Sequence, residues 1–232
     1  MKRFWKSAAA VAADGDWIIE LDGKPIRTPA RELLKVPNGP LARAIADEWN
    51  DVGDTVDPRS MPLTGLANAA TDRVAPDRAA FAEGLARYGE SDLACYRAEG
   101  PRSLVERQSH SWDALLGWAR RRYDVDFATT QGVTHVSQPR ATVERLAHAV
   151  ATLDPFQLAG LSPLVTIGGS LVAALAVLEG TLSVEEAWDA VSIDERWQLE
   201  QWGSDAEAEA VLENRRRDFV AAARFLELLG RT

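Results

Sequence analysis

Cysteine and histidine are scarce in this sequence of 232 residues. Cys95 is its one cysteine, and there are three histidines. A single cysteine excludes an internal disulfide, and it excludes the zinc and iron–sulfur sites that need several thiolates. The composition therefore fits a protein of a reducing compartment.

Long apolar runs are also scarce. Residues 155–178 carry no charge, and this window is long enough to span a bilayer. Pro163 and several glycines interrupt it, and polar side chains such as Gln157 lie within it. A lipid-facing helix of that composition inserts poorly, so we expect a buried core helix and no membrane insertion. No apolar stretch of signal-peptide length follows Lys2, and we expect no such leader.

Basic residues are outnumbered by acidic ones. The chain has 26 Lys and Arg against 35 Asp and Glu, a formal net charge of −9. Nucleic acids and anionic membranes attract cationic proteins, so we expect neither as a partner. The hydrophobic fraction of 46% and the charged fraction of 26% are ordinary for a globular protein and exclude wholesale disorder.

The first sixty residues predict a small β-rich unit. Residues 17–21 form a short apolar run, and the Asp22-Gly23 pair after it is a strong hairpin signal. Residues 24–29 and 33–37 follow as short strands with prolines, which suit the edges of a sheet. We expect the unit to end near Pro40, which opens a helix that runs to about Trp49.

Helical periodicity dominates after Pro62. One buried helix face is predicted by spacings of three and four between Leu104, Gln108, Trp112, Leu115 and Ala119. Capping boxes, in which a serine is followed three residues later by glutamate, mark helix starts at Ser183, Ser192 and Ser204. We therefore predict an α+β fold, with a β-rich domain at residues 1–60 and an α-helical domain at 61–232.

Residues with catalytic potential are dispersed. His110 and Asp113 lie on adjacent turns of one predicted helix, and Cys95 has no histidine within fifteen residues. No pair of histidines has the i, i+4 spacing of a zinc-binding helix. We expect no catalytic residue, cofactor or metal, and a site assembled by folding from these three residues stays open as an alternative.

The chain has eight tryptophans, an unusual number for its length. Trp197 and Trp202 flank Glu200 in one predicted helix. Large aromatic side chains usually fill cores, and they also anchor protein interfaces. The acidic residues between Asp194 and Glu213 form either a negative face for a basic partner or a solvated surface.

Ordered motifs along almost the whole chain, from about residue 3 to residue 229, carry a family resemblance. They are Arg3-Phe4-Trp5-Lys6, Leu21-Asp22-Gly23-Lys24-Pro25-Ile26-Arg27-Thr28-Pro29, Ala46-Asp47-Glu48-Trp49, Met61-Pro62-Leu63-Thr64, Tyr88-Gly89-Glu90-Ser91-Asp92-Leu93-Ala94-Cys95-Tyr96-Arg97, Trp112-Asp113, Gly169-Ser170-Leu171 and Glu200-Gln201-Trp202-Gly203. The chain resembles the assembly chaperones of the α subunit of the F-type ATP synthase. Its 22 arginines against 4 lysines fit a bacterial member with a GC-rich genome.

The resemblance implies a two-part fold and a function that is not catalytic. The implied function is that of a molecular chaperone that binds the free α subunit transiently and shields its β-facing surface. The β subunit then displaces it, without nucleotide, cofactor or metal. The resemblance also implies a monomeric, cytoplasmic protein in bacteria, whereas eukaryotic relatives would work in the mitochondrial matrix. One departure is Ser204, where we expect an acidic residue in many relatives, which weakens any claim of a required charge there.

For binding to the α subunit, we predict two clusters of contact residues. The first consists of Glu200, Trp202, Glu207 and Glu209, and the second of Glu48 and Trp49. Glu207 fits a helix cap equally well, and Trp49 is better explained as a core residue.

Two further functions stay open at this point. One is a small soluble hydrolase or transferase with a dispersed site around His110, Asp113 and Cys95. The other is a stable subunit of a larger complex.

Overall fold

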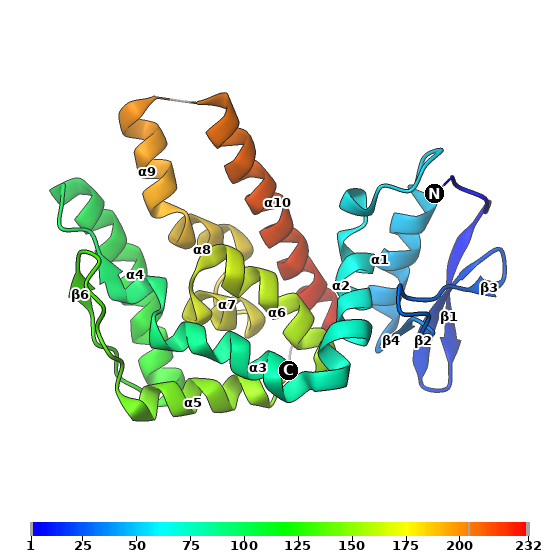
Figure 1. Cartoon of the computed structure of the whole chain (residues 1–232), viewed down its shortest axis with the longest axis horizontal. Helices are drawn as coiled ribbons and strands as arrows, with labels where there is room; N and C mark the ends of the chain where they lie inside the picture. The colour runs from blue at the N-terminus through cyan, green and yellow to red at the C-terminus, as the bar shows by residue number, and fades with distance from the viewer. Residues whose placement is uncertain (1, 204, 231–232) are drawn as a thin grey trace.

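The chain forms a small strand-containing unit at its N-terminal end and a larger helical body after it (Figure 1). The structure is a computed structural model that describes residues 2–203 and 205–230. The predicted α+β class is confirmed, with the strands segregated at one end of a mostly helical fold. The domain boundary at residue 60 stays a prediction, because Met61 and Leu63 pack into the same core as the strands.

The N-terminal sheet is antiparallel and has four strands: β1 (Ala8–Ala13), β2 (Asp16–Leu21), β3 (Lys24–Pro25) and β4 (Lys35–Val36). β1 pairs with β2 along its full length, so that Ala8 lies opposite Leu21. β3 and β4 pair with the other edge of β2, near its two ends. The predicted hairpin turn at Asp22-Gly23 is confirmed, with φ of +48° and +79°, as a type I′ turn requires.

Helix α1 (Gly39–Asn50) packs across this sheet and confirms the helix predicted at residues 40–49. Asn38 caps it by accepting a hydrogen bond from the Leu41 amide at 3.0 Å, and Pro40 lies in its first turn. Leu41 and Ile45 are fully buried against the strands. Their burial closes the core of the N-terminal unit.

Within residues 2–203 and 205–230, the helical body contains nine further α-helices, several short helical turns and a short parallel strand pair. The helices are α2 (Pro62–Ala69), α3 (Arg78–Ala86), α4 (Arg102–Tyr123), α5 (Arg140–Ala151), α6 (Pro155–Gly168), α7 (Leu171–Leu178), α8 (Val184–Val191), α9 (Ile193–Trp202) and α10 (Ala206–Leu229). The strands are β5 (Tyr96–Arg97) and β6 (Thr130–Gln131). The predicted face of α4 is buried throughout, from Leu104 to Ala119.

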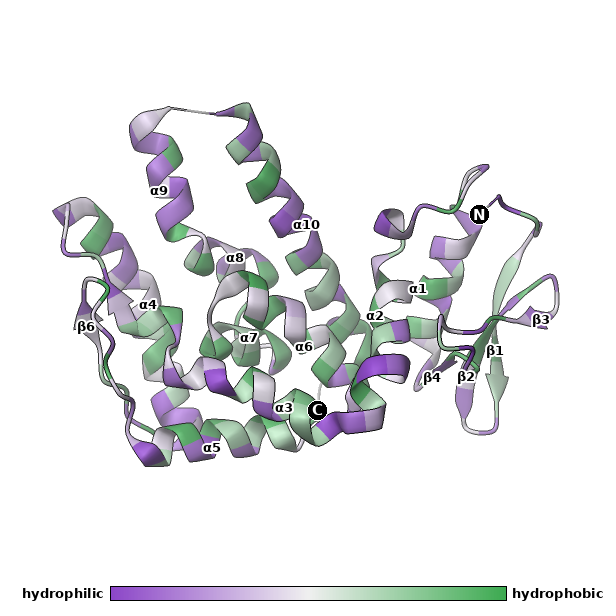
Figure 2. Cartoon of the chain, in the orientation of Figure 1, coloured by the Kyte–Doolittle hydropathy of each residue, from purple (hydrophilic) through white to green (hydrophobic). Residues whose placement is uncertain are grey.

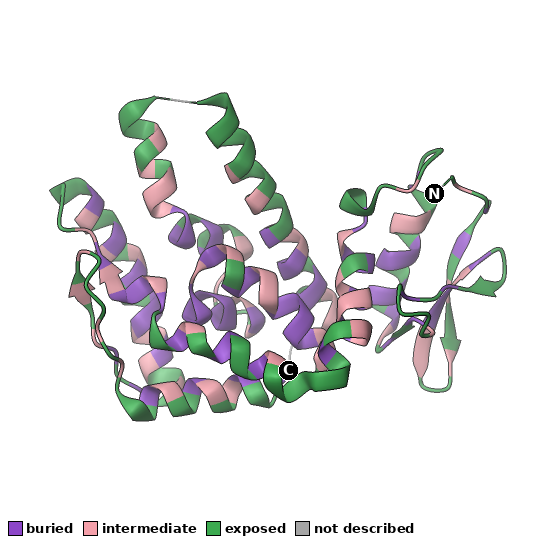
Figure 3. Ribbon diagram, viewed as in Figure 1, coloured by how far each residue is buried: buried purple, intermediate pink, exposed green. Residues whose placement is uncertain are grey.

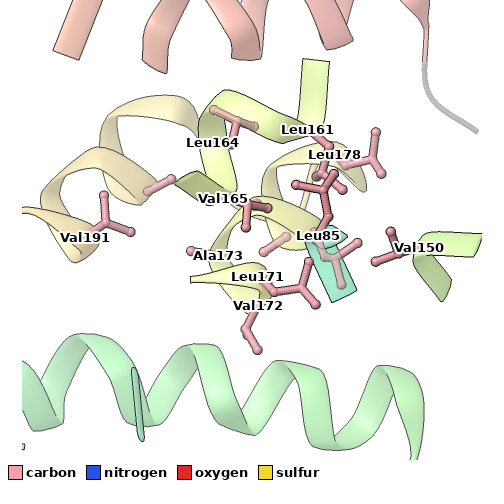
Figure 4. Close-up of a cluster of buried hydrophobic side chains, with 14 of the residues drawn as sticks. Leu85, Val150, Leu161, Leu164, Val165, Leu171, Val172, Ala173, Leu178 and Val191 are labelled. Carbon is pink, nitrogen blue, oxygen red and sulfur yellow. The ribbon is translucent and has the colours of Figure 1, made fainter. Parts of the chain in front are cut away.

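The uncharged segment forms two buried helices, α6 and α7, and not the single helix that we expected. Gly169 ends α6 with a φ of +67°, and the Ser170 hydroxyl then caps α7. Figure 4 shows side chains of both helices in the core, among them Leu164 and Leu171. Within residues 2–203 and 205–230, no helix has both the length and the hydropathy needed to cross a membrane.

Two glycines in α6 allow close contacts with neighbouring helices. A Cβ atom on Gly160 would lie 2.6 Å from Leu226 Cδ2 of α10. A Cβ atom on Gly168 would lie 3.2 Å from Val191 Cγ1 of α8. Both distances are shorter than ordinary van der Waals contact, so a larger residue would push the helices apart.

One of the three predicted capping boxes is confirmed. Ser183 and Glu186 make both reciprocal bonds at the start of α8. The box at Ser192 is wrong, because the Ser192 hydroxyl donates to the Trp188 carbonyl at 2.6 Å and Glu195 instead pairs with Arg215. The predicted box at Ser204 lies outside the described residues.

Asp92 ties the middle of the chain to the start of α7. Its buried carboxylate accepts hydrogen bonds from the Ala94 amide at 3.0 Å, the Ser170 hydroxyl at 2.8 Å and the Val172 amide at 2.9 Å. Burial raises the pKa of Asp92, and these hydrogen bonds act in the opposite direction. Because every group that contacts the Asp92 carboxylate is a hydrogen-bond donor, a side chain with its own N–H donor would find no acceptor there.

We expect Asp92→Asn to lower the free energy of unfolding by about 2–3 kcal/mol, because the new amide points a donor at other buried donors. Ser170→Ala is the comparison variant and loses about 1–2 kcal/mol, since it removes the α7 cap and one bond to Asp92 but adds no donor. Urea denaturation measures both. An Asp92→Asn variant that is no less stable than Ser170→Ala would contradict this role for Asp92.

Candidate functional site

Helices α9 and α10 form a hairpin that projects from the helical body (Figure 1). All residues of α9 are described, and none is buried. In α10 the first buried residue is Phe219, more than halfway along the helix. Figure 3 shows the resulting concentration of exposed residues at the outer end of both helices.

An open groove, here called the tip groove, lies between α9 and α10 near this end. Its apolar lining is made by Leu199, Trp202, Ala208, Val211 and Leu212, and its volume is about 480 Å³. Trp202 is 76% exposed and Val211 is 53% exposed, although both are large and hydrophobic. Figure 2 shows hydrophobic segments that continue toward the outer end of α10. Such an exposed apolar surface is typical of a site that another protein covers.

Polar contacts to α4 and α10 help to position α9, in addition to the packing of Ile193 against the core. Arg107 of α4 pairs with Glu200 at 2.6 Å, and Gln108 donates to Asp194 at 2.7 Å. On the other side, Arg215 of α10 pairs with Glu195 at 2.9 Å. Exposed ion pairs of this kind contribute less than about 1 kcal/mol each. The two ion pairs of the hairpin therefore cost little to rearrange.

The acidic residues predicted as a contact face fall into two groups. Glu200 is engaged with Arg107, as described above. Glu207 and Glu209 lie exposed in the first turn of α10, and neither forms an ion pair within the part of the chain that the structure describes. The helix dipole stabilises negative charge at that position. The tip groove thus has an acidic border that includes Glu207 and Asp205.

Glu48 has an internal role. Its half-buried carboxylate accepts hydrogen bonds from the Leu63 amide at 2.7 Å, the Thr64 amide at 2.8 Å and the Thr64 hydroxyl at 2.7 Å. Met61, the residue before α2, makes no side-chain cap, so Glu48 supplies the cap from α1. Burial raises the pKa of Glu48, and the Thr64 and Leu63 hydrogen bonds oppose that rise.

Trp49 also packs inside the N-terminal unit. Its ring meets Trp5 edge-on at 5.1 Å, and its backbone carbonyl accepts the Trp5 indole N–H at 3.1 Å. This arrangement favours the core interpretation of Trp49. Glu48 and Trp49 therefore lie on a different part of the molecule from Trp202, and the structure does not join the two predicted clusters.

Among the described residues, no hydrogen bond or ion pair links Cys95, His110 and Asp113, the residues of the alternative catalytic site. Cys95 is fully buried, and burial raises the pKa of its thiol to about 12. His110 is exposed on α4, and Asp113 pairs with Arg97 at 2.8 Å. A buried thiol that stays protonated is a poor nucleophile. Among the described residues, no group of three or more His, Cys, Asp or Glu side chains is placed to hold a metal ion.

Comparison with known proteins now identifies the family. The model of the family described as ATP12 chaperone protein matches residues 2–120, about half of the chain. This chain belongs to the ATP12 chaperone family. The resemblance inferred from the sequence motifs is thereby confirmed.

Solved structures agree with the ATP12 assignment over almost the full chain. Atp12 of Paracoccus denitrificans is 41% identical, with a TM-score of 0.93 over 98% of each chain. The Atu1473 protein of Agrobacterium tumefaciens is 40% identical, with a TM-score of 0.94 over 98% of this chain and 86% of that one. "Protein atp12, mitochondrial" of Schizosaccharomyces pombe is 27% identical over 223 residues, which cover 90% of this chain and 76% of that protein.

Sequence reasoning missed part of the tip groove. Neither Val211 nor Leu212 is among the predicted contact residues, and both line the groove. The detectable signal is that Ala208, Val211 and Leu212 extend the apolar stripe of α10 beyond its buried half.

We expect Cys95 in the native protein to react with a water-soluble maleimide at pH 8 at least about 100-fold more slowly than in concentrated urea, because the thiol is buried and protonated. Mass spectrometry over time measures the labelled fraction. The urea-unfolded protein is the control. Equal rates in both conditions would show an accessible thiolate and would revive the catalytic alternative.

Proposed function

We propose that this ATP12-family chain is an assembly chaperone of the F-type ATP synthase that binds the free α subunit. In this proposal it covers the surface of α that later meets the β subunit, and the β subunit displaces it. Family membership supports the general activity. The observation that carries the site is Trp202, a large aromatic side chain left 76% exposed beside an apolar groove.

The mechanism that we propose needs only binding. A free subunit exposes an apolar interface, and covering it competes with aggregation. The β subunit releases the chaperone by mass action if it binds the same surface more tightly. No catalytic step, nucleotide, cofactor or metal is part of the proposal. The chain would act as a monomer in the bacterial cytoplasm.

We assign Trp202 as the apolar anchor of the α-subunit contact. Exposed aromatic side chains at the centre of a contact contribute much of its binding energy. Glu207 and Glu209 would face cationic groups of the α subunit and orient it. Glu200 already pairs with Arg107, so it would contact the α subunit only after that ion pair breaks. We now propose that Glu48 and Trp49 support the fold of the N-terminal unit instead of contacting α.

Size-exclusion chromatography of the chain with isolated α subunit tests the proposal directly. We expect the two proteins to share a peak that dissolves when β subunit is added, because β takes the same surface. Separate peaks, with α aggregating as fast as it does alone, would contradict the proposal. Continued presence of the chain in the assembled synthase would indicate a stable subunit instead.

We expect Trp202→Ala to weaken binding to α by roughly tenfold or more, since it removes the anchor of the groove, while stability changes by less than about 0.5 kcal/mol. Phe4→Ala is the matched control, because Phe4 is a large aromatic residue that is 72% exposed on the N-terminal unit. Calorimetric titration measures both affinities. Equal losses for the two variants would show that Trp202 has no special role.

A further inference from the structure

A second concave surface lies between α1 and the middle of α10, which face each other in Figure 1. We call it the α1–α10 cleft, and its volume is about 370 Å³. Its α1 wall is acidic, with Asp47, Glu48 and Asp51, and its α10 wall is basic, with Arg216, Arg217 and Arg224. Apolar atoms of Pro62, Leu63 and Val220 also line it.

In the part of the chain that the structure describes, the two walls make no direct ion pair, although Arg224 of α10 favours the charged form of Glu48 and so opposes the rise in its pKa that burial causes. Among the described residues, no ion pair within 4.0 Å joins α1 to α10. Arg216 lies 3.8 Å from Glu213 of its own helix, and Arg217 donates to Asn214. Because these opposite charges do not contact each other directly, they can pair with charged groups on a ligand.

The fold keeps these walls apart. Phe225 of α10 is fully buried in the N-terminal core and stacks on Phe156 at 6.2 Å. Asn38 donates to the Leu229 carbonyl at 2.9 Å, and Glu48 joins α1 to α2 through three hydrogen bonds. Closing the cleft would require breaking this packing, so the cleft is preformed.

A smaller hollow on α10 shares lining residues with the tip groove and with the α1–α10 cleft. Leu199 and Leu212 line the tip groove and also a neighbouring hollow on α10. Arg216 lines that hollow and the α1–α10 cleft.

We propose that the α1–α10 cleft binds a segment of the client protein that carries charges of both signs. Acidic side chains of the segment would pair with the arginines of α10, and basic ones with Asp47 and Asp51 of α1. A small apolar side chain would lie over Leu63 and Val220. The inference rests on the proposed function only in taking the α subunit as the client.

Charge reversal on each wall tests the cleft. We expect Arg217→Glu and Asp47→Arg each to weaken binding to isolated α subunit by roughly tenfold. Both residues are exposed, so neither change disturbs the core. The matched controls are Arg121→Glu on α4 and Asp218→Arg on α10, which are exposed and lie outside the cleft lining. We expect the controls to change affinity less than about twofold.

The double variant Asp47→Arg/Arg217→Glu separates ligand binding from attraction between the walls. It restores opposite charges across the cleft and keeps the net charge, yet it presents the wrong sign to the client on each side. We expect its affinity to fall at least as far as that of either single variant. Wild-type affinity in the double variant, or single variants that match their controls, would overturn the cleft proposal. Wild-type protein that fails to bind α would instead refute the proposed function and, with it, α as the occupant of the cleft.

Discussion

Burial of the C-terminal half of α10 between two hydrophobic cores is the constraint on which both candidate surfaces depend. Phe225 packs into the core of the N-terminal unit, and the next residue, Leu226, packs into the core of the helical body. Gly160 lets α6 approach this part of α10 closely. One end of the helix is thus fixed by apolar packing, and the other end extends into solvent with α9.

The contrast between the buried and exposed halves of α10 explains how a stable fold can present a contact surface that rearranges easily. The outer half of α10 and the whole of α9 contribute no buried residue before Phe219. Ion pairs such as Arg107–Glu200 and Arg215–Glu195 hold the hairpin, and they exchange partners at low cost. Segments with little buried apolar surface open locally before the core does. A chaperone that binds and then releases a client needs a contact of moderate strength, which under the proposed function this hairpin would supply.

Much of the fold was predictable because it follows from local patterns. The Asp22-Gly23 turn, α1 and the buried face of α4 each depend on residues close in sequence. β1 was missed because its alanines have low strand propensity, and its pairing with β2 supplies what propensity does not. The break at Gly169 was missed because apolar periodicity alone does not show where one buried helix ends.

The candidate site was predictable only in part, for the same reason. Trp202 and the acidic residues near it stood out by type, and the structure adds the groove beside them. Glu48 was assigned to a partner because its bonds to Leu63 and Thr64, 15 and 16 residues away, leave no local signal. The arginines of α10 were not predicted as part of a site, since their position opposite α1 depends on tertiary packing.

The most direct test of this account places a photo-cross-linking residue at Val211 in the tip groove, with exposed Val133 as the control. We predict that a cross-link to the α subunit forms from position 211 and not from position 133. We also predict that this cross-link is lost when the β subunit is added. Equal cross-linking from position 133, or a cross-link at 211 that persists with β, would contradict it.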